Sequence, residues 1–277
     1  MQANDPLAPK GTSADSAVGA STLAPRSALP EALRRSFVAV PRPDALIAAA
    51  EAHRLTSVKA MALRAMRQVA NHYDAAAWLD AYRLVLLDTA GFDALLPEAP
   101  RRTLLDVGAG TGEVHAELAR LFESSVATET SEGTARRARE KGIDCRTIDL
   151  GRVPWPDDSR FDAVAMLNVL DRADRPLTLL DRAAQLLGPG GHLILASPLP
   201  IRAHVHRAGG TSDPDEWLGV EGDDFESALS CLVESVLRKR GFSLVRWTRT
   251  PYVSSGDPRA ARYELDDAIL VLARPGR

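Results

Sequence analysis

The sequence predicts an α/β fold in which helices cover both faces of a mostly parallel, seven-stranded sheet, preceded by a helical extension. From residue 100 onward, short apolar strands alternate with helices, and this alternation is typical of parallel pairing. Near the end of the chain, two strands stand too close together for a helical crossover, so we expect an antiparallel strand to close the sheet. A glycine-rich turn joins the first strand of this region to its first helix, as in Rossmann-like folds.

The chain changes character twice before this region. Residues 1–28 are rich in Ala, Ser, Pro and Gly and contain few large apolar groups, which predicts a disordered tail. Residues 29–99 predict a helical extension: one helix over 30–37, one or two over 43–71, and helical character from Trp78 to Gly91. Residues 100–277 form the predicted main domain.

Within the main domain, each element follows from its apolar pattern. Helices are predicted by amphipathic spacing over residues 114–122, 132–141, 177–187 and 225–239. Strands are predicted over residues 102–107, 125–129, 145–149, 161–167, 192–196, 242–249 and 268–273. The last two are the antiparallel pair, an ending typical of class I methyltransferases and unlike that of dinucleotide dehydrogenases.

Composition excludes several classes of protein. With 45% hydrophobic and 26% charged residues, the chain has the mix of a globular protein. A formal net charge of −3 provides no field that attracts nucleic acid, and no apolar run is long enough to span a membrane. The first residues lack the apolar region of a secretory signal, and Cys145 and Cys231 show no C-x-x-C spacing. We therefore expect a cytoplasmic monomer with reduced thiols.

The glycine-rich turn is the first candidate ligand site. It reads Asp106-Val107-Gly108-Ala109-Gly110-Thr111-Gly112, with Glu113 next. Glycines allow a sharp turn and a close backbone approach to a ligand. The acidic residues at both ends of the turn would repel a pyrophosphate, whereas a zwitterionic sulfonium tolerates them. The turn therefore predicts S-adenosylmethionine rather than NAD as the cofactor, with Asp106, Gly108, Gly110 and Gly112 among the cofactor-binding residues.

Two more carboxylates follow at predicted strand ends. Glu129 closes the second strand, where a carboxylate accepts hydrogen bonds from both ribose hydroxyls. Asp149 closes the third strand and is expected to accept from the adenine amino group, with Leu150 packed on the ring. The alternative interpretation of both acids is that they are solvated residues at strand ends.

The fourth strand leads into Asn168-Val169-Leu170-Asp171-Arg172, and a later segment reads Arg249-Thr250-Pro251-Tyr252. With residues 104–114, 127–132 and 263–268, these motifs resemble the DREV methyltransferase family over roughly residues 29–273. The resemblance implies methylation of histidine side chains in proteins, at the Nδ1 nitrogen of His-x-His motifs. It therefore implies a histidine-containing protein or peptide as the partner.

Asn168 and Asp171 suit imidazole chemistry and are the predicted catalytic and substrate-binding residues. An imidazole attacks only through its unprotonated nitrogen, so a group must hold the proton on Nε2. Asp171 can accept from Nε2–H and stabilise the imidazolium that forms. Asn168 is expected to bind a substrate carbonyl or the imidazole, and Tyr252 and Arg249 complete the predicted substrate site. The alternative for Asn168 and Asp171 is a helix cap.

Other interpretations stay open on sequence alone. The same fold and cofactor serve small-molecule N- or O-methyltransferases, and a non-catalytic module that binds S-adenosylmethionine or a partner is a third possibility. His204-Val205-His206 offers two metal ligands without a third, so no metal site is predicted. Acidic residues crowd the segment 213–226, which we interpret as a solvated face beside the expected substrate entrance.

Overall fold

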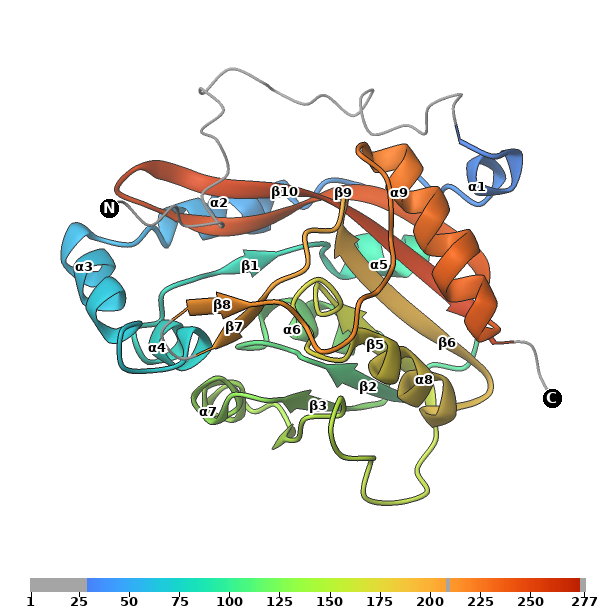
Figure 1. Cartoon of the computed structure of the whole chain (residues 1–277), viewed down its shortest axis with the longest axis horizontal. Coiled ribbons are helices and arrows are strands. Elements are labelled where there is room, and N and C mark those ends of the chain that lie inside the picture. Colours follow the sequence, from blue (N-terminus) through green and yellow to red (C-terminus); the bar gives the residue numbers. More distant parts are fainter. Residues whose placement is uncertain (1–28, 208–209, 275–277) are drawn as a thin grey trace.

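The computed structural model describes residues 29–207 and 210–274 (Figure 1). The predicted tail, residues 1–28, lies outside the described residues. The main sheet has eight strands in the order β1-β9-β10-β6-β5-β2-β3-β4. Its strands are β1 (Leu84–Val85), β2 (Thr103–Val107), β3 (Ser124–Glu129), β4 (Cys145–Thr147), β5 (Phe161–Leu167), β6 (Leu187–Pro198), β9 (Ser243–Asp257) and β10 (Ala260–Ala273).

Strand directions confirm the predicted fold class. Strands β4, β3, β2, β5 and β6 pair in parallel. Strand β10 is antiparallel to β6 on one side and to β9 on the other. The last strand of the chain therefore inserts between the fifth parallel strand and β9, which is the antiparallel closure that the short separation of the two strands predicted.

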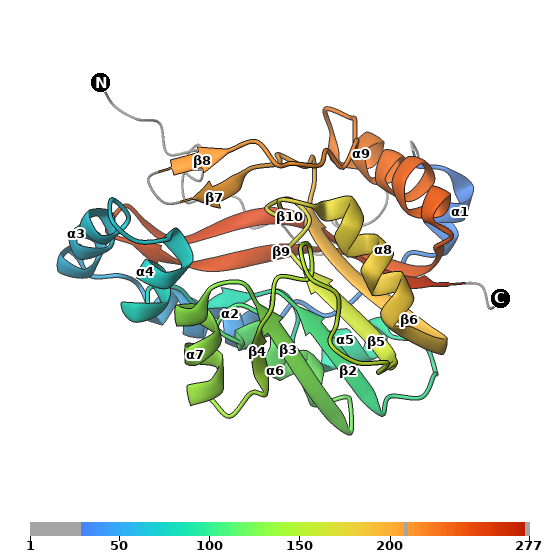
Figure 2. The ribbon, with the colours of Figure 1, turned by 60° about the horizontal axis from the view of Figure 1, so that its bottom comes forward.

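Helices cover both faces of this sheet (Figure 2). One face carries α5 (Thr89–Leu95), α6 (Glu113–Ala119) and α7 (Glu132–Glu140), and the other carries α8 (Pro176–Leu186) and α9 (Phe225–Cys231). Helix α9 continues as a π-helix (Leu232–Leu237) and a 3₁₀ turn (Arg238–Arg240). Two large apolar clusters, one on each face, fill the space between these helices and the sheet.

The extension differs from the sequence prediction at one place. We expected helical character from Trp78 to Gly91, but Leu84 and Val85 form strand β1, which pairs with Ser254 and Val253 of β9. That expectation was wrong because the edge of the long strand β9 offers backbone partners that outweigh a weak local helix preference. The sheet therefore has eight strands rather than seven.

The rest of the extension is helical as predicted, and it is tied to the main domain. It contains α1 (Glu31–Arg35), α2 (Asp44–Ala52), α3 (Ser57–Met66) and α4 (His72–Trp78). Behind α1, the indole Nε1–H of the fully buried Trp247 donates to the Leu33 carbonyl over 2.6 Å, and Phe37 packs edge-on against the same indole. Helix α5, in the last part of the extension, packs into the core beside β2.

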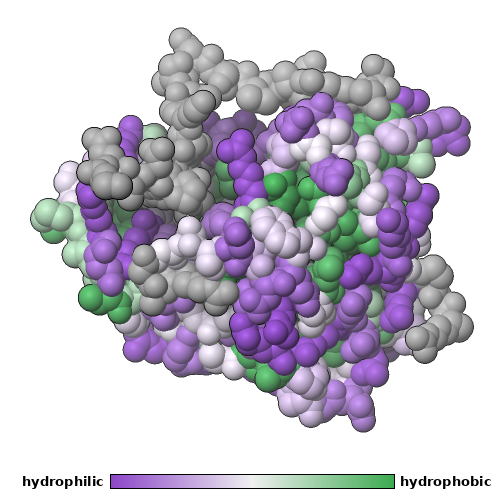
Figure 3. Space-filling model, viewed as in Figure 1, coloured by the Kyte–Doolittle hydropathy of each residue, from purple (hydrophilic) through white to green (hydrophobic). Residues whose placement is uncertain are grey.

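A small second sheet covers the carboxyl edge of the parallel strands. Strands β7 (Val205–Arg207) and β8 (Gly210–Ser212) pair antiparallel and lie beside α4 in both ribbon views (Figures 1 and 2). The face seen in Figure 3 is mainly hydrophilic, with apolar areas beneath α9 and at the end of the molecule occupied by α3. Among the described residues, no helix combines the length and the apolar character that crossing a membrane requires.

Candidate active site

The glycine turn lies at the carboxyl end of β2 and leads into α6. All three glycines have positive φ angles, +74° at Gly108, +63° at Gly110 and +89° at Gly112, which side chains rarely adopt. They nevertheless differ in surroundings. A Cβ on Gly112 would lie 2.1 Å from Ile143 Cδ1, and one on Gly108 would lie 2.7 Å from Val169 Cγ2, whereas one on Gly110 would meet nothing within 4 Å. Gly108 and Gly112 therefore serve close packing, whereas the space beside Gly110 is open.

Asp106 is the penultimate residue of β2, just before this turn, and is 1% exposed. Its Oδ2 lies 3.0 Å from Nδ1 of the buried His115, whose Nε2 lies 3.2 Å from Ser125 Oγ. Its Oδ1 has no hydrogen-bond partner in the described part of the chain. A buried carboxylate oxygen without a partner is costly, so Asp106 is suited to receive a donor from a bound ligand.

Glu129 stands at the end of β3, next to the turn. Its Oε1 accepts from the Gly110 N–H over 2.6 Å, and its Oε2 accepts from the Thr130 N–H over 3.1 Å. Burial raises the pKa of Glu129 to about 7, although these backbone donors favour the charged form; Asp106 adds to the rise. The structure thus brings Asp106, Gly110 and Glu129 together at one edge of the sheet.

The two residues predicted at the adenine lie just beyond β4. That strand ends at Thr147, two residues earlier than Asp149. Asp149 Oδ1 accepts from the Gly151 N–H over 2.8 Å, which folds the chain back after the strand. Leu150 is 3% exposed and belongs to the core cluster on the α8 face. Contacts of Asp149 and Leu150 with adenine remain predictions.

Asn168 and Asp171 follow β5 and are both buried, 5% and 3% exposed. Asn168 adopts a left-handed conformation, φ +59°, and its N–H donates to the Ala196 carbonyl of β6. Arg172 donates to both carboxylate oxygens of Asp171, from Nε over 3.3 Å and from Nη2 over 3.0 Å. Burial opposes the charge on Arg172, but Asp171, Tyr73 and Tyr252 outweigh it and keep the pKa of Arg172 above its usual range.

The two residues predicted on β9 lie on opposite faces of the sheet. Tyr252 faces the α6 side, where burial raises the pKa of its phenol and Arg172, Asp267 and Asp171 are its charged neighbours. Arg249 faces α9. It donates to Asp266 from Nε over 2.8 Å, lies 3.4 Å from Glu226, and its guanidinium stacks over the Phe225 ring. Tyr252 therefore lies near Asp171, whereas Arg249 is bound by Asp266 and Glu226 on the other face of the sheet.

Helix α4 brings residues to the site that the sequence did not point out. Burial raises the pKa of Tyr73 to about 12, and its charged neighbours are Arg172, Asp171 and Glu129. Asp74 fixes the helix, because its Oδ1 accepts from Ser131 Oγ over 2.6 Å and from the Gly133 N–H over 2.8 Å at the start of α7. Only the Asn71 cap, which starts α4, was visible as a sequence signal.

Asp267 on β10 is a second residue that the sequence analysis missed. It is fully buried, opposite Thr250 of β9 and Pro198 of β6. Burial raises its pKa well above the usual range; the Asn168 amide opposes this shift, and the charge of Asp171 adds to it. A weak sequence signal was the adjacent pair Asp266-Asp267, because neighbouring residues of a strand point to opposite faces and one of the two acids must then face inward.

The His204-Val205-His206 segment is ordered rather than a solvated loop. The His204 N–H donates to the Asp171 carbonyl over 3.0 Å, and Val205 and His206 belong to β7. The His206 ring stacks on the His72 ring of α4, with centroids 4.4 Å apart and planes 10° apart. Burial, with Arg67 and His206 next, lowers the pKa of His72 to about 3. Among the described residues, no cluster of three or more His, Cys, Asp or Glu side chains could hold a metal.

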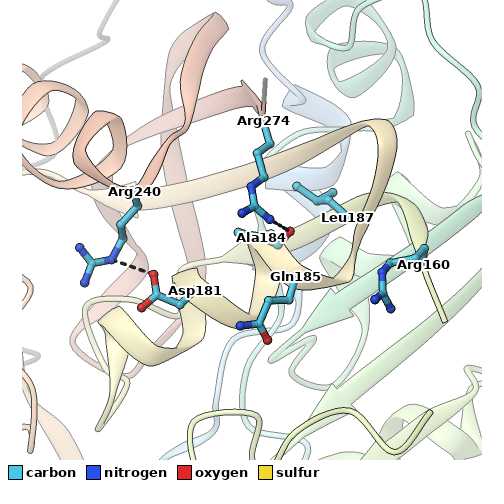
Figure 4. A pocket seen from close by; sticks show the side chains of 7 residues that line it. All are labelled: Arg160, Asp181, Ala184, Gln185, Leu187, Arg240 and Arg274. Atoms are coloured by element: carbon cyan, nitrogen blue, oxygen red, sulfur yellow. Dashed lines mark hydrogen bonds and ion pairs between the residues drawn. The ribbon is translucent and has the colours of Figure 1, made fainter. Parts of the chain in front are cut away.

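A cavity of about 550 Å³ lies away from these residues, at the opposite, amino edge of the parallel strands. Figure 4 shows Arg240 paired with Asp181 on one side, Arg160 on the other side, and Gln185 and Arg274 between them. The three guanidinium groups point in different directions and do not converge on one point. This cavity is therefore not the continuation of the glycine-turn site.

Comparison with known proteins identifies the chain. The sequence model of the DREV methyltransferase family matches residues 82–274. The chain belongs to the DREV methyltransferase family. Family membership confirms the resemblance carried by the Asn168–Arg172 and Arg249–Tyr252 motifs, and it confirms S-adenosylmethionine as the cofactor.

More distant relatives match a smaller part of this DREV protein. A ubiquinone biosynthesis O-methyltransferase of Alkalilimnicola ehrlichii is 30% identical over 102 residues, 35% of this chain and 41% of the relative. A demethylmenaquinone methyltransferase of Clavibacter sepedonicus is 33% identical over 117 residues, 39% of this chain and 47% of the relative. The chain thus spans less than half of either relative. Among solved structures, a methyltransferase of Leishmania major aligns with a TM-score of 0.48 at 14% identity, over 78% of this chain and 82% of that one.

The residues around the glycine turn fit S-adenosylmethionine. Gly110 leaves a cradle that a side chain would enter, the Asp106 Oδ1 lacks a donor, and Glu129 presents a carboxylate beside the same backbone. Glu129 would hold the ribose hydroxyls, and Asp106 would face the cationic amino acid end. Asp171 is a charged neighbour of both Tyr252 and Tyr73, and the contacts of these residues and of Asn168 with an acceptor remain predictions.

Proposed function

We propose that this DREV protein methylates the Nδ1 nitrogen of histidine side chains in His-x-His segments of a protein or peptide. The observation that carries the proposal is the buried pair that follows β5. Asp171 is held by Arg172, and Asn168 has two side-chain polar atoms without a hydrogen-bond partner among the described residues. A planar ring that carries both a donor and an acceptor matches this pair.

The chemistry required of the protein is mainly orientation. S-adenosylmethionine supplies an electrophilic methyl group when it is bound. Asp171 accepts the Nε2–H of the acceptor imidazole, which leaves the Nδ1 lone pair free for attack. As the N–C bond forms and the C–S bond breaks, the same carboxylate stabilises the positive charge that develops on the ring, and the Nε2 proton then leaves to solvent. Because the neutral ring is already a nucleophile, alignment supplies much of the rate enhancement.

Tyr252 and Tyr73 flank the acceptor from two sides. Tyr252 comes from β9 and Tyr73 from α4, and both have Asp171 and Arg172 as charged neighbours. Their raised pKa values keep the phenols neutral at physiological pH, so each can donate a hydrogen bond to the acceptor or stack on it. We assign them to substrate binding. Arg249 has a positioning role at most, because Asp266 and Glu226 already bind its guanidinium.

The test is methylation of a synthetic His-x-His peptide with labelled cofactor, followed by mass spectrometry that locates the methyl group. We expect one methyl group on Nδ1, and Asp171→Asn should lower kcat by about two decades with little change in cofactor affinity. Asp181→Asn, the same change on the exposed face of α8, is the matched control and should leave kcat unchanged. Equal activity of the Asp171→Asn variant and wild type would show that Asp171 is only a cap.

The named relatives support one competing function, a small-molecule methyltransferase. One is an O-methyltransferase of ubiquinone biosynthesis and the other is a demethylmenaquinone methyltransferase, although the matched regions cover less than half of each relative. Parallel assays with a quinol and with the peptide separate the two functions. Methylation of the quinol alone would replace the histidine proposal. Tight cofactor binding without transfer to either acceptor would favour a non-catalytic module.

A further inference from the structure

Asn168 and Asp267 form an unusual buried pair. Asn168 is 5% exposed and Asp267 is fully buried, yet none of their four side-chain nitrogen and oxygen atoms makes a hydrogen bond of good geometry within the described residues. Buried polar groups in native proteins are almost always paired, so each such exception needs an explanation. The two groups lie close together: the Asn168 N–H donates to the Ala196 carbonyl of β6, Asp267 pairs with Pro198 of the same strand, and the Asn168 amide lowers the pKa of Asp267.

An amide is chemically different at its two ends. Its oxygen only accepts hydrogen bonds and its NH₂ only donates them, and rotation about the last side-chain bond exchanges the two ends. The neighbour that binds one end therefore decides which end faces a ligand. For Asn168, that neighbour is Asp267. An ionised carboxylate would hold the NH₂ and leave the oxygen for the acceptor, whereas a carboxylic acid would do the reverse.

The surroundings of Asp267 favour the carboxylic acid. Burial raises its pKa well above the usual range. Asn168 and Arg172 lower this pKa, but the charges of Asp171 and Asp266 raise it further. The Tyr252 phenol of β9 is the remaining titratable neighbour and is neutral. This direction favours the protonated carboxyl, which has an O–H to donate.

We propose that Asp267 is a positioning residue whose carboxylic acid donates its O–H to Asn168 Oδ1 and so turns the Asn168 NH₂ toward the acceptor. This inference rests on the proposed methyl transfer and adds a recognition feature to it. The acceptor must present a hydrogen-bond acceptor such as a carbonyl oxygen close to the methylated ring. A peptide backbone has such a group beside every side chain, whereas a free amine has none.

Two variants of Asp267 separate the possibilities. In Asp267→Asn the new amide N–H can donate to Asn168 Oδ1 as the acid does, so kcat should stay within about three-fold of wild type. Asp267→Leu has a similar volume but no donor, and its kcat should fall at least ten-fold with unchanged cofactor affinity. Asp267→Asn keeps a donor for Asn168 Oδ1 and should melt close to wild type, whereas Asp267→Leu leaves that oxygen unpaired and should melt at a lower temperature. Melting of Asp267→Asn well below wild type would overturn the proposal.

The pH profile adds a readout that a merely structural residue would not move. Ionisation of Asp267 should reverse the Asn168 amide, so wild-type kcat should fall on the alkaline side and Asp267→Asn should lack that fall. If Asp267→Asn is as inactive as Asp267→Leu, the carboxylate is the working form and the proposal is wrong. If both variants keep full activity, Asp267 does not position Asn168.

Infrared spectroscopy tests the protonation state without any acceptor. The difference spectrum between wild type and Asp267→Asn at neutral pH should contain the C=O stretch of a carboxylic acid. A band with no methylation of the peptide would leave this inference standing and reject the histidine function. Methylation of the peptide without the band would reject the inference and leave the function standing.

Discussion

The contrast between Gly110 and Gly112 gives the sharpest test of the cofactor site. Replacing either glycine by alanine places a side chain at a positive φ, which costs about 1–2 kcal/mol. At Gly112 the new Cβ also lies 2.1 Å from Ile143 Cδ1, and such overpacking costs about 1–3 kcal/mol more. Gly112→Ala should therefore lose about 2–5 kcal/mol of unfolding free energy, and Gly110→Ala only about 1–2 kcal/mol.

The two variants should differ in which property they lose: Gly112→Ala should lose more melting temperature, and Gly110→Ala should lose more cofactor affinity. For a chain of this size, 1 kcal/mol corresponds to roughly 2–4 °C, so Tm should fall by roughly 4–20 °C for Gly112→Ala and roughly 2–8 °C for Gly110→Ala. The methyl group at Gly110 would enter the open cradle, and the Kd of S-adenosylhomocysteine should rise at least ten-fold, which corresponds to about 1.4 kcal/mol. Folded Gly112→Ala should bind with nearly unchanged affinity. Thermal unfolding and titration calorimetry measure the two effects separately.

Gly142→Ala is the matched control. Gly142 has φ +83° and open space around its missing Cβ, but it lies after α7 rather than in the turn. Gly142→Ala should lower the melting temperature about as much as Gly110→Ala does, because of the same positive φ, but should leave the Kd of S-adenosylhomocysteine unchanged. If Gly110→Ala binds the cofactor product as well as Gly142→Ala does, the turn is not the cofactor cradle and the reasoning fails.

Two further predictions concern Glu129 and Asp74. Burial raises the pKa of Glu129 to about 7, so cofactor binding to its carboxylate should weaken as pH falls through 7, and Glu129→Gln should bind more weakly without that pH step. The pH dependence of stability has the opposite sign. The pKa of Glu129 in the folded protein lies above its ordinary value of 4.5, so wild type should lose stability as pH rises from 4.5 to 7, whereas Glu129→Gln should not; unfolding experiments across that range measure the difference. Asp74→Ala removes the acceptor of two hydrogen bonds at the start of α7 and should cost about 1–3 kcal/mol by denaturant unfolding, with a raised KM for the acceptor because Tyr73 loosens. Unchanged KM would mean that α4 does not line the acceptor site.

Local sequence determined the elements of the main domain and the cofactor half of the site. The glycine turn, the acid at the end of β2 and the acid at the end of β3 are set by residues within a few positions of each strand end, and parallel strands bring their carboxyl ends to one edge. The N-x-x-D-R motif likewise follows β5 directly. For these residues, sequence position fixes position in space as soon as the strand order is known.

The acceptor side was decided only by tertiary structure. Tyr73 and Asp267 are almost 200 residues apart in sequence, and neither was predicted as a site residue, although Asp267 lies in the segment 263–268 that resembles the DREV family. Tyr73 reaches the site because Asp74 anchors α4 on α7, and Asp267 reaches Asn168 because β10 inserts beside β6. Strand β1 shows the same effect, since the edge of β9 outweighed its local preference. Local propensity and spacing determine which residues stand at the end of each strand. Long-range packing determines which side chains from distant parts of the sequence contact those residues, and no local sequence pattern predicts these contacts.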